Sequence, residues 1–326
     1  MVRRIADLEV GELGLGCMGL ATVYGRPDPR EARATLDAAL EGGVRLLDTA
    51  DMYGDGTSER FLGEWLPGRR DRVVLATKAG IRTRLGGLPA GLDGRPAHLR
   101  AALDASLGRL GTDHVDLYYL HRVDPRVPIE DSVGAIAGFV QAGKVRQVGV
   151  SEVTASELLR AHSVHPIAAV QSEWSLFTRD LERDVVPAAR SIGATVVPYS
   201  PLGRGMLTGD PRATTRLPLL DYRRFLPRWR GANLRRNLAL VDRVREVAGR
   251  IGATPAQVAL AWLLGQGEDV VPIPGTTRRR SLADNLGATR ITLTDGDRAA
   301  LDGLQAAGGR YGRRGAMGVL PEDAAG

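Results

Sequence analysis

Short apolar runs of strand length recur along the chain, and most are separated by segments whose apolar residues have helical spacing. In seven of the eight runs a polar or special residue stands at the end of the apolar stretch. The runs cover residues 13–16, 44–47, 73–77, 115–120, 145–150, 167–170, 195–198 and 270–273. Eight strands alternating with helices predict one (β/α)8 TIM barrel domain over residues 1–326, with its functional groups at the carboxyl ends of the strands.

The boundaries of the first helix are encoded locally. Asp28 is a capping residue, Pro29 suits the first helical position, and the pair Gly42-Gly43 ends the apolar periodicity. Similar patterns predict helices over 58–66, 96–110, 129–141, 155–161, 180–191, 238–250, 254–264, 278–286 and 294–306. Residues 203–237 form a long irregular loop, which we expect at the catalytic face. Residues 308–326 are rich in glycine and alanine, and they are predicted to form a flexible tail.

The composition fits a protein with a large buried core. Of 326 residues 43% are hydrophobic, and no apolar run approaches the roughly 18 residues of a membrane span. The N-terminus reaches Asp7 without an apolar segment, so no signal peptide is predicted. Cys17 is the single cysteine, which argues against an internal disulfide framework and a cysteine-based metal site. We therefore expect a cytoplasmic protein without a metal.

The charged residues are strongly biased toward arginine. The net charge is +6, and only Lys78 and Lys144 are lysine, so 44 − 2 = 42 of the basic residues are arginine. Against this background a lysine at a strand end suggests a need for a compact ammonium group. Several arginines cluster within 203–237, but the chain carries no recognisable nucleic-acid-binding module. A solvated loop or a site for phosphate groups explains this cluster better than nucleic acid does.

Residues 14–19 spell Gly-x-Gly-x-x-Gly, the pattern of dinucleotide-binding Rossmann domains. In a true fingerprint the third glycine lies within a helix, whereas here the turn-like residues 23–27 follow. The motif is therefore a poor indication of a Rossmann domain. We expect instead a short strand whose glycines let the backbone approach closely at the barrel mouth, or plain turn glycines.

Four groups with complementary chemistry stand at or near three successive strand ends: Asp48, Tyr53, Lys78 and His121. A free tyrosine has a pKa near 10, and a nearby ammonium is expected to lower it. The carboxylate would hold the lysine, and the imidazole could orient a carbonyl oxygen. Such a set can stabilise an oxyanion and deliver a proton as a hydride reaches carbon. Taken singly, Asp48 could be a structural cap and His121 a core histidine.

Several motifs in this order resemble the aldo-keto reductase superfamily over nearly the whole chain. They are residues 47–50 with Tyr53-Gly54, Thr77-Lys78, 116–118 with His121, 143–146 with 149–151, Gln171, 199–203 and 273–276. Residues 16–20 and 171–176 resemble the microbial and plant branch that includes perakine-reductase-like enzymes. The resemblance implies that Asp48, Tyr53, Lys78 and His121 form the catalytic tetrad, with Tyr53 as the general acid.

The resemblance also implies NADPH lying extended across the barrel mouth. Ser151 and Gln171 would bind the carboxamide, Tyr199 would stack on the nicotinamide, residues 200–205 would cover the pyrophosphate, and the arginines 278–280 would suit a 2′-phosphate. The implied cofactor-binding set is Met18, Ser151, Gln171, Tyr199, Ser200, Leu202, Gly203, Gly205, Gly275, Thr276, Arg278, Arg280, Asp284 and Asn285. The loops carrying Tyr24 and Trp174 are expected to shape the site of a small-molecule carbonyl substrate.

Two positions depart from the pattern that the resemblance suggests. Glu152 stands where many relatives have asparagine, and Ser281 stands where another phosphate ligand often occurs. The implied reaction is NADPH-dependent reduction of an aldehyde or ketone to an alcohol. The alternatives are a non-enzymatic NADPH-binding regulatory subunit of the same fold, or a dedicated ketosugar, pyridoxal or natural-product reductase.

Overall fold

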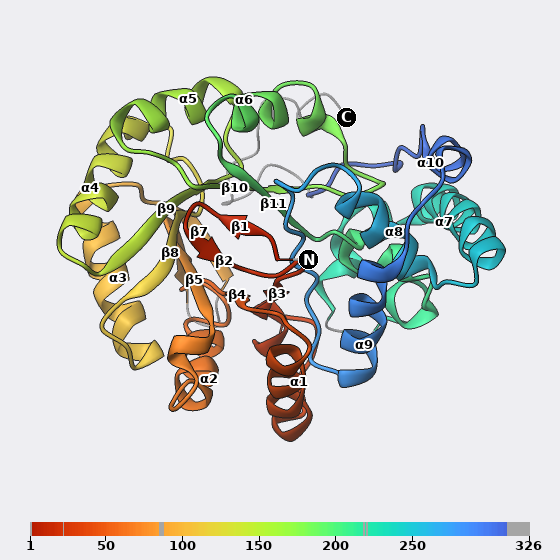
Figure 1. The fold of residues 1–326 in the computed structure, drawn as a ribbon, viewed down its shortest axis with the longest axis horizontal. Coiled ribbons are helices and arrows are strands. Elements are labelled where there is room, and N and C mark those ends of the chain that lie inside the picture. The colour runs from red at the N-terminus through yellow and green to blue at the C-terminus, as the bar shows by residue number, and fades with distance from the viewer. Residues whose placement is uncertain (1, 22, 85–87, 218, 220, 312–326) are drawn as a thin grey trace.

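The computed structural model describes residues 2–21, 23–84, 88–217, 219 and 221–311, and its centre is a curved parallel sheet (Figure 1). Seven strands are hydrogen-bonded in the order β11-β10-β9-β8-β5-β4-β3. Their bounds are β3 Leu15–Gly16, β4 Leu46–Asp48, β5 Val74–Ala79, β8 Val115–Leu120, β9 Val145–Ser151, β10 Ala169–Glu173 and β11 Thr195–Tyr199. All pairs in this sheet are parallel, so the carboxyl ends of the strands lie at one rim.

The extended segment 269–275 closes the gap between the two edges of the sheet. On one side Val271 N donates to Val196 O at 2.9 Å, and on the other side Gly14 N donates to Pro272 O at 2.9 Å. Pro272 and Pro274 have no N–H group, which prevents a continuous ladder and leaves only short bridges. The predicted eight-membered barrel is confirmed, with seven regular strands and this segment in the eighth position.

Close backbone contact at the closure explains one of the early glycines. A Cβ atom on Gly16 would lie 2.9 Å from the carbonyl oxygen of Ile273, and Gly16 pairs with Gly275. Only a residue without a side chain fits there unless the neighbouring backbone moves. The glycines of 14–19 thus belong to a short barrel strand, and the rejection of a Rossmann domain is confirmed.

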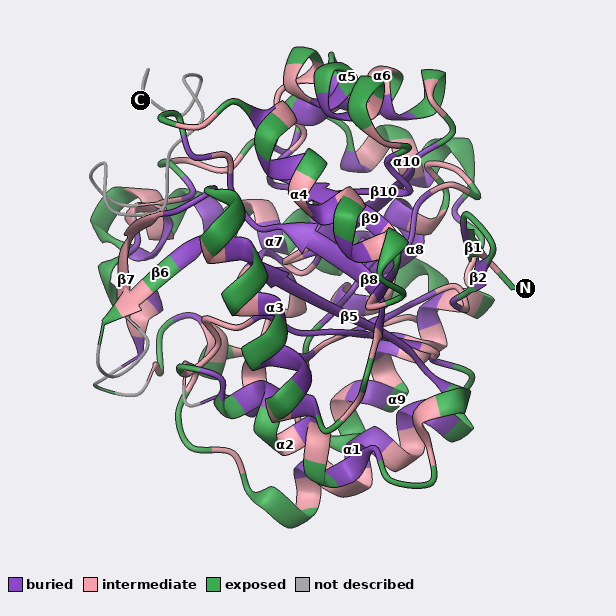
Figure 2. Ribbon diagram, turned by 90° about the vertical axis from the view of Figure 1, so that its left-hand side faces the viewer, coloured by how far each residue is buried: buried purple, intermediate pink, exposed green. Residues whose placement is uncertain are grey.

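Ten helices, counted over the part of the chain that the structure describes, surround the sheet with their buried faces inward (Figure 2). The predicted cap of the first is present, since the Asp28 side chain accepts a hydrogen bond from Arg30 N at 2.9 Å. The bounds are α1 Pro29–Glu41, α2 Thr57–Trp65, α3 Pro96–Leu110, α4 Ile129–Gln141, α5 Ala155–Val164, α6 Val185–Ser191, α7 Gly231–Ile251, α8 Pro255–Leu264, α9 Arg279–Gly287 and α10 Asp295–Leu301.

The long loop is shorter than predicted because α7 begins at Gly231 rather than near residue 238. Residues 231–237 include three of the chain's many polar side chains in succession, Arg235, Arg236 and Asn237, which weakens the apolar periodicity there. Before α7 the loop forms four short 3-10 helices: η4 Gly203–Thr208, η5 Pro211–Ala213, η6 Tyr222–Phe225 and η7 Pro227–Trp229. The last helix, α10, is also shorter than the predicted 294–306.

Two antiparallel hairpins were not predicted. The first joins β1 (Arg4–Ile5) to β2 (Leu8–Glu9), and its side chains Ile5 and Leu8 are buried with the barrel-interior residues. Complete burial of one such side chain contributes about 1.5–3 kcal/mol, which holds this short hairpin in place. The second joins β6 (Ile81–Arg84) to β7 (Leu88–Leu92) just after β5.

The predicted flexible tail divides into two parts. Residues 312–326 lie outside the described residues. Residues 308–311 lie against the barrel mouth, where the Arg310 side chain is buried. Among the described helices none is both long and apolar enough to cross a membrane.

Candidate active site

The carboxyl ends of β4 and β5 create a buried ion pair. Asp48 is the last residue of β4, and Lys78 lies near the end of the adjacent β5. Lys78 Nζ lies 2.6 Å from Asp48 Oδ1 and donates to the carbonyl oxygen of Thr49 at 2.8 Å. The exposed fractions of 0% for Lys78 and 2% for Asp48 remove both charges from solvent. A fully buried charge is tolerable only with such partners.

Tyr53 and His121 complete the predicted group of four. A turn after β4 includes Asp55, which has φ of 54°, and it carries Tyr53 back over the barrel. Lys78 Nζ lies 5.3 Å from the centre of the Tyr53 ring. The Tyr53 and His121 rings meet edge to face, with their centres 6.1 Å apart and an interplanar angle of 84°. The structure therefore brings all four residues together.

Burial dominates the protonation of Tyr53. Burial raises the pKa of Tyr53, and this effect exceeds the lowering by the Lys78 ammonium. The Lys78 ammonium does lower the pKa of Tyr53, as expected from the sequence, but desolvation raises it more, and the sequence provides no measure of desolvation. For Lys78 burial lowers the pKa, but Asp48 and Tyr53 together raise it above its usual value. At neutral pH the site holds a neutral phenol beside a charged ammonium.

His121 is neutral for the same kind of reason. Burial, followed by the charges of Arg122 and Lys78, holds the pKa of His121 well below its ordinary value. Its Nδ1 atom is buried and has no hydrogen-bond partner among the described residues. A neutral imidazole can donate one N–H group to an oxygen without adding a charge. This matches the expected role of orienting a carbonyl.

The predicted carboxamide-binding residues stand at the next strand ends. Gln171 in β10 donates from Nε2 to Asp48 Oδ2 at 2.8 Å, so it also fixes the carboxylate that holds Lys78. Ser151 ends β9, and its hydroxyl accepts a hydrogen bond from Arg122 Nη1 at 3.1 Å. Tyr199 ends β11, at the same rim of the barrel.

The loop after β11 contains backbone in the left-handed region. Ser200 has φ of 47° and Arg204 has φ of 55°, although neither is glycine. Gly203 and Gly205 also have positive φ, and Leu202 packs against the core. Left-handed conformations of non-glycine residues cost about 1–3 kcal/mol each and are concentrated at ligand clamps and active sites. The strain supports a binding role for this loop.

The arginines at the start of α9 are not equivalent. Arg279 pairs with Glu31 in α1, with 2.9 Å between Nη2 and Oε2. Arg278 and Arg280 are exposed, and neither forms an ion pair with another described residue. The sequence analysis assigned the 2′-phosphate to the arginines 278–280 without choosing among them, and Arg278 and Arg280 are the two that form no ion pair with another described residue. Of the neighbouring predicted positions, Met18 lies in η1 (Cys17–Leu20), Gly275 ends the closing segment, Thr276 follows it, and Asp284 and Asn285 lie in α9.

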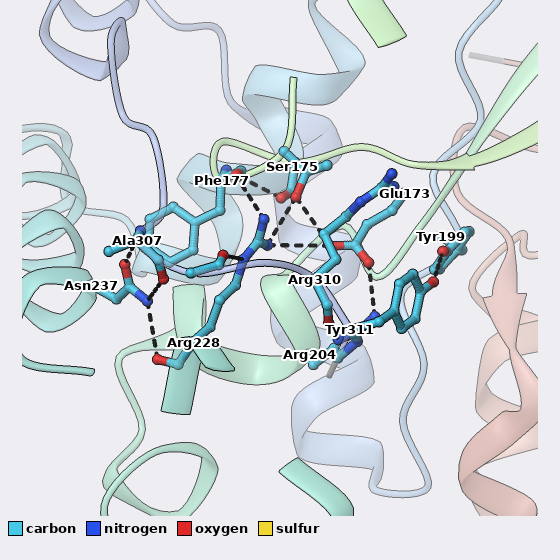
Figure 3. Close-up of polar contacts among 12 residues, drawn as sticks. Glu173, Ser175, Phe177, Tyr199, Arg204, Arg228, Asn237, Ala307, Arg310 and Tyr311 are labelled. Carbon is cyan, nitrogen blue, oxygen red and sulfur yellow. Dashed lines mark hydrogen bonds and ion pairs between the residues drawn. The ribbon is translucent and has the colours of Figure 1, made fainter. Parts of the chain in front are cut away.

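The sequence did not reveal a buried ionic cluster at the mouth (Figure 3). Glu173, at the end of β10, lies 2.9 Å from Arg204 Nη2 and 3.3 Å from Arg228 Nη1. Glu152 lies 3.4 Å from Arg310 Nη1 and accepts a hydrogen bond from Glu173 N. The unusual glutamate after Ser151 was the only sequence signal. In the structure Glu152 pairs with Arg310, which lies in the chain segment that follows α10.

Of the two predicted substrate residues, one lies at the mouth and the other does not. The Tyr24 hydroxyl lies 3.2 Å from that of Tyr222 in η6, at the edge of the long loop. The Trp174 side chain is 1% exposed and packs edge to face on Trp262, with ring centres 6.3 Å apart. Its indole N–H donates to Glu182 at 2.9 Å. The prediction for Trp174 is corrected: this ring belongs to the core between β10 and α8.

Comparison with known proteins agrees with this geometry. The model of the aldo/keto reductase family matches residues 12–306. The chain belongs to the aldo-keto reductase family. A protein of Glycine max named probable aldo-keto reductase 1 is 42% identical over 310 residues, covering 93% of this chain and 89% of that protein.

Solved structures of aldo-keto reductases also superpose on this chain. One is the glycerol dehydrogenase AKR11B4 from Gluconobacter oxydans, with a TM-score of 0.84, 30% identity, and coverage of 93% of this chain and 94% of the other. Another is the holo form of aldo-keto reductase AKR11C1 from Bacillus halodurans, with a TM-score of 0.75, 30% identity, and coverage of 94% and 96%. Membership implies oxidoreduction of carbonyl compounds with a nicotinamide cofactor.

Proposed function

We propose that this aldo-keto reductase reduces an aldehyde or ketone to an alcohol with NADPH, and that Tyr53 is the general acid. The observation that carries the proposal is the buried arrangement of a neutral phenol, a charged Lys78 and a neutral His121 whose Nδ1 has no partner among the described residues. We further propose that it acts in the cytoplasm, as its single cysteine suggests.

The residues present fit the nicotinamide cofactor that the family uses. The strained loop after β11 offers backbone donors to phosphate groups, and Arg278 and Arg280, which form no ion pair with other described residues, offer charged donors at an α-helix N-terminus. Ser151, Gln171 and Tyr199 would hold the nicotinamide end. Met18, Ser200, Leu202, Gly203, Gly205, Gly275, Thr276, Asp284 and Asn285 would line the remainder. When bound, the reduced nicotinamide supplies the hydride.

The side chains of this protein divide the remaining work. The neutral His121 orients the carbonyl oxygen, and the Tyr53 hydroxyl donates its proton to that oxygen as the carbon accepts a hydride. The electron pair of the carbonyl π bond forms the O–H bond of the alcohol with the proton from Tyr53. Tyr53 is left as a phenolate, which regains a proton from solvent. The Lys78 ammonium stabilises the phenolate, while Asp48, itself fixed by Gln171, holds the ammonium in place.

The proton-donor role is tested by Tyr53→Phe, which removes only a hydroxyl group. Turnover should fall by at least about 100-fold, as expected for loss of a general acid, while NADPH affinity and thermal unfolding stay close to those of the native protein. The assay is NADPH oxidation across a panel of aldehydes. A variant with nearly normal kcat would show that another group supplies the proton.

The preference for NADPH is tested separately at α9. Replacing Arg278 and Arg280 together by alanine should weaken NADPH binding by about tenfold and leave NADH binding almost unchanged. Arg279→Ala is the matched control, because Arg279 is already paired with Glu31. Fluorescence titration gives both dissociation constants. Equal weakening of the two cofactors by the double variant would place the 2′-phosphate elsewhere.

A further inference from the structure

The barrel mouth holds more buried positive charge than its described carboxylates neutralise. Arg122, Arg228 and Arg310 are each 7% exposed, and the Arg204 side chain is 6% exposed. The carboxylates among them are Glu152 and Glu173, with exposed fractions of 6% and 2%. Apart from the pair of Arg310 with Glu152, the set holds three guanidinium groups and one described carboxylate, Glu173. Burying charge in excess is costly unless an anion compensates it.

The excess is most evident at Arg122, the residue after His121. Its Nη1 donates to the carbonyl oxygen of His121 at 2.6 Å and to Ser151 Oγ at 3.1 Å, and its Nη2 lies 3.4 Å from the Tyr311 hydroxyl. All three acceptors are neutral. No carboxylate of the described chain lies within ion-pair distance of this guanidinium.

Glu152 is the carboxylate whose charge acts on Arg122, and both it and the neighbouring Glu173 are already engaged. Glu152 pairs with Arg310 and accepts from Glu173 N, while Glu173 is shared by Arg204 and Arg228. The other titratable groups that interact with Arg122 include His121 and the phenols Tyr53, Tyr199 and Tyr311, all of which are neutral at neutral pH. Among the described residues, the guanidinium of Arg122, beside His121, therefore has no carboxylate as an ion-pair partner.

A guanidinium presents several N–H donors in a planar fork, which matches a carboxylate in geometry as well as charge. His121 and Tyr53 mark where the carbonyl oxygen of a substrate is expected, and Arg122 follows His121 directly. We infer that Arg122 binds a carboxylate on the substrate, so that this enzyme prefers aldehydes or ketones that carry an acid group. The inference rests on the proposed function, since it assigns the substrate class of the same site.

The test compares one carbonyl compound with and without a negative charge. The probes are para-carboxybenzaldehyde and its methyl ester, which carry the same aldehyde. The native enzyme should have the higher kcat/KM for the acid. Arg122→Met should lower kcat/KM for the acid by about 10- to 100-fold, the range expected for a lost hydrogen bond to a charged group, and change that for the ester by much less.

Two further variants separate charge recognition from structural damage. Arg122→Lys keeps a charge but loses the fork, so it should retain part of the preference for the acid. Arg126→Met is the matched control, because Arg126 lies in the same loop with its side chain 72% exposed and should not alter the ratio of acid to ester. The ratio is the decisive measurement, since general loosening of the site would lower both activities together.

The outcomes distinguish this inference from the proposed function. Equal kcat/KM for acid and ester in the native enzyme, or an unchanged ratio in Arg122→Met, overturns the inference while leaving carbonyl reduction intact. If neither aldehyde is reduced, calorimetric titration of benzoate and benzamide into the NADPH-saturated protein replaces turnover. Binding of benzoate alone, lost in Arg122→Met, supports the inference, and equal binding or no binding overturns it. If Arg122→Met does not fold, Arg122→Lys is compared with the native enzyme instead, by the ratio of kcat/KM for the acid to kcat/KM for the ester.

Discussion

The two buried ionic sites of this protein differ in how they are built. Lys78 and Asp48 form a single pair from neighbouring strands, 30 residues apart in the chain, with 2.6 Å between Nζ and Oδ1. Glu173 instead receives Arg204 from the long loop and Arg228 from η7, 31 and 55 residues away. The first site depends on strand register alone. The second exists only when loops have been folded over the mouth.

The partners of the second site show what it stabilises. Besides Glu173, Arg228 donates to Thr178 Oγ1 and to the carbonyl oxygens of Phe177 and Gly308, and Arg204 donates to that of Arg310. These bonds connect β10, the long loop and the segment after α10 (Figure 3). The comparison suggests that the Lys78 pair serves chemistry and the Glu173 cluster serves the architecture of the mouth.

Removing the central carboxylate should therefore have the largest effect on stability. Glu173→Gln leaves two buried guanidinium groups without their shared anion, and losing one partner of a buried ion pair typically costs about 3–5 kcal/mol. Urea unfolding would measure the loss. Glu130→Gln, which breaks a partly exposed pair with Arg160 on the helices, is the control and should cost far less. Similar losses in both variants would refute the architectural role.

The opposite behaviour is expected at the other site, where Lys78→Arg should impair catalysis more than folding. A guanidinium is wider than an ammonium and carries a planar fork, so it cannot take the compact position between Asp48 and Tyr53. Turnover should fall by about 100-fold or more, equivalent to about 2.7 kcal/mol of transition-state stabilisation. Single-turnover NADPH oxidation measures this, with circular dichroism as the folding check. A folded variant with native rates would mean that Lys78 provides only charge.

This difference also explains which parts could be predicted from sequence. Asp48, Lys78 and His121 each follow or end an apolar run, and parallel strands bring their carboxyl ends to one rim, so the spacing was sufficient. The arginines of the Glu173 cluster could not be distinguished among 42 arginines in the chain. Their partners depend on loop conformation, including the positive φ of Arg204, which no periodicity encodes.

Trp174 and Tyr53 show the same effect of burial. Trp174 follows a strand end, but whether its ring faces the mouth or the helices depends on packing against Trp262. For Tyr53 the sequence indicated the ammonium neighbour but not the desolvation that raises the pKa of the phenol. Patterns along the chain locate strand ends, whereas solvent exclusion is a property of the assembled barrel.

Asp51 is a buried carboxyl group that belongs to neither of the two ionic sites. Burial, followed by the negative charge of Glu59, raises its pKa from 3.8 to about 8, and Oδ1 has no hydrogen-bond partner among the described residues. The folded state then binds the proton more tightly than the unfolded state. The free energy of unfolding should therefore decrease as the pH rises from about 4 to about 8.

Asparagine at this position does not titrate, so Asp51→Asn should remove that loss. At pH 8 the variant should be more stable than the native protein by about 2 kcal/mol, and the difference should shrink toward pH 4. Urea unfolding at several pH values measures the difference. A stability difference independent of pH would show that Asp51 is ionised in the folded protein throughout this range.

The smallest effect on stability and cofactor binding is expected for a hydrogen bond between uncharged groups, which joins the segment after α10 to the proposed cofactor site. The Tyr311 hydroxyl is hydrogen-bonded to that of Tyr199, the residue proposed to stack on the nicotinamide. A hydrogen bond between uncharged groups contributes about 1 kcal/mol, so Tyr311→Phe should lower the free energy of unfolding by about that amount. It should also weaken NADPH binding by no more than about fivefold, because the Tyr199 ring keeps its place at the end of β11.

Tyr222→Phe is the matched control for this last comparison. It removes the hydroxyl that faces Tyr24, also a contact between two tyrosines, but at the edge of the long loop rather than beside Tyr199. Both variants should lose similar stability in urea unfolding, and only Tyr311→Phe should alter the fluorescence titration with NADPH. If Tyr311→Phe instead abolishes binding, the segment after α10 belongs to the cofactor site itself. The distinction between a chemical site and a supporting cluster would then no longer hold.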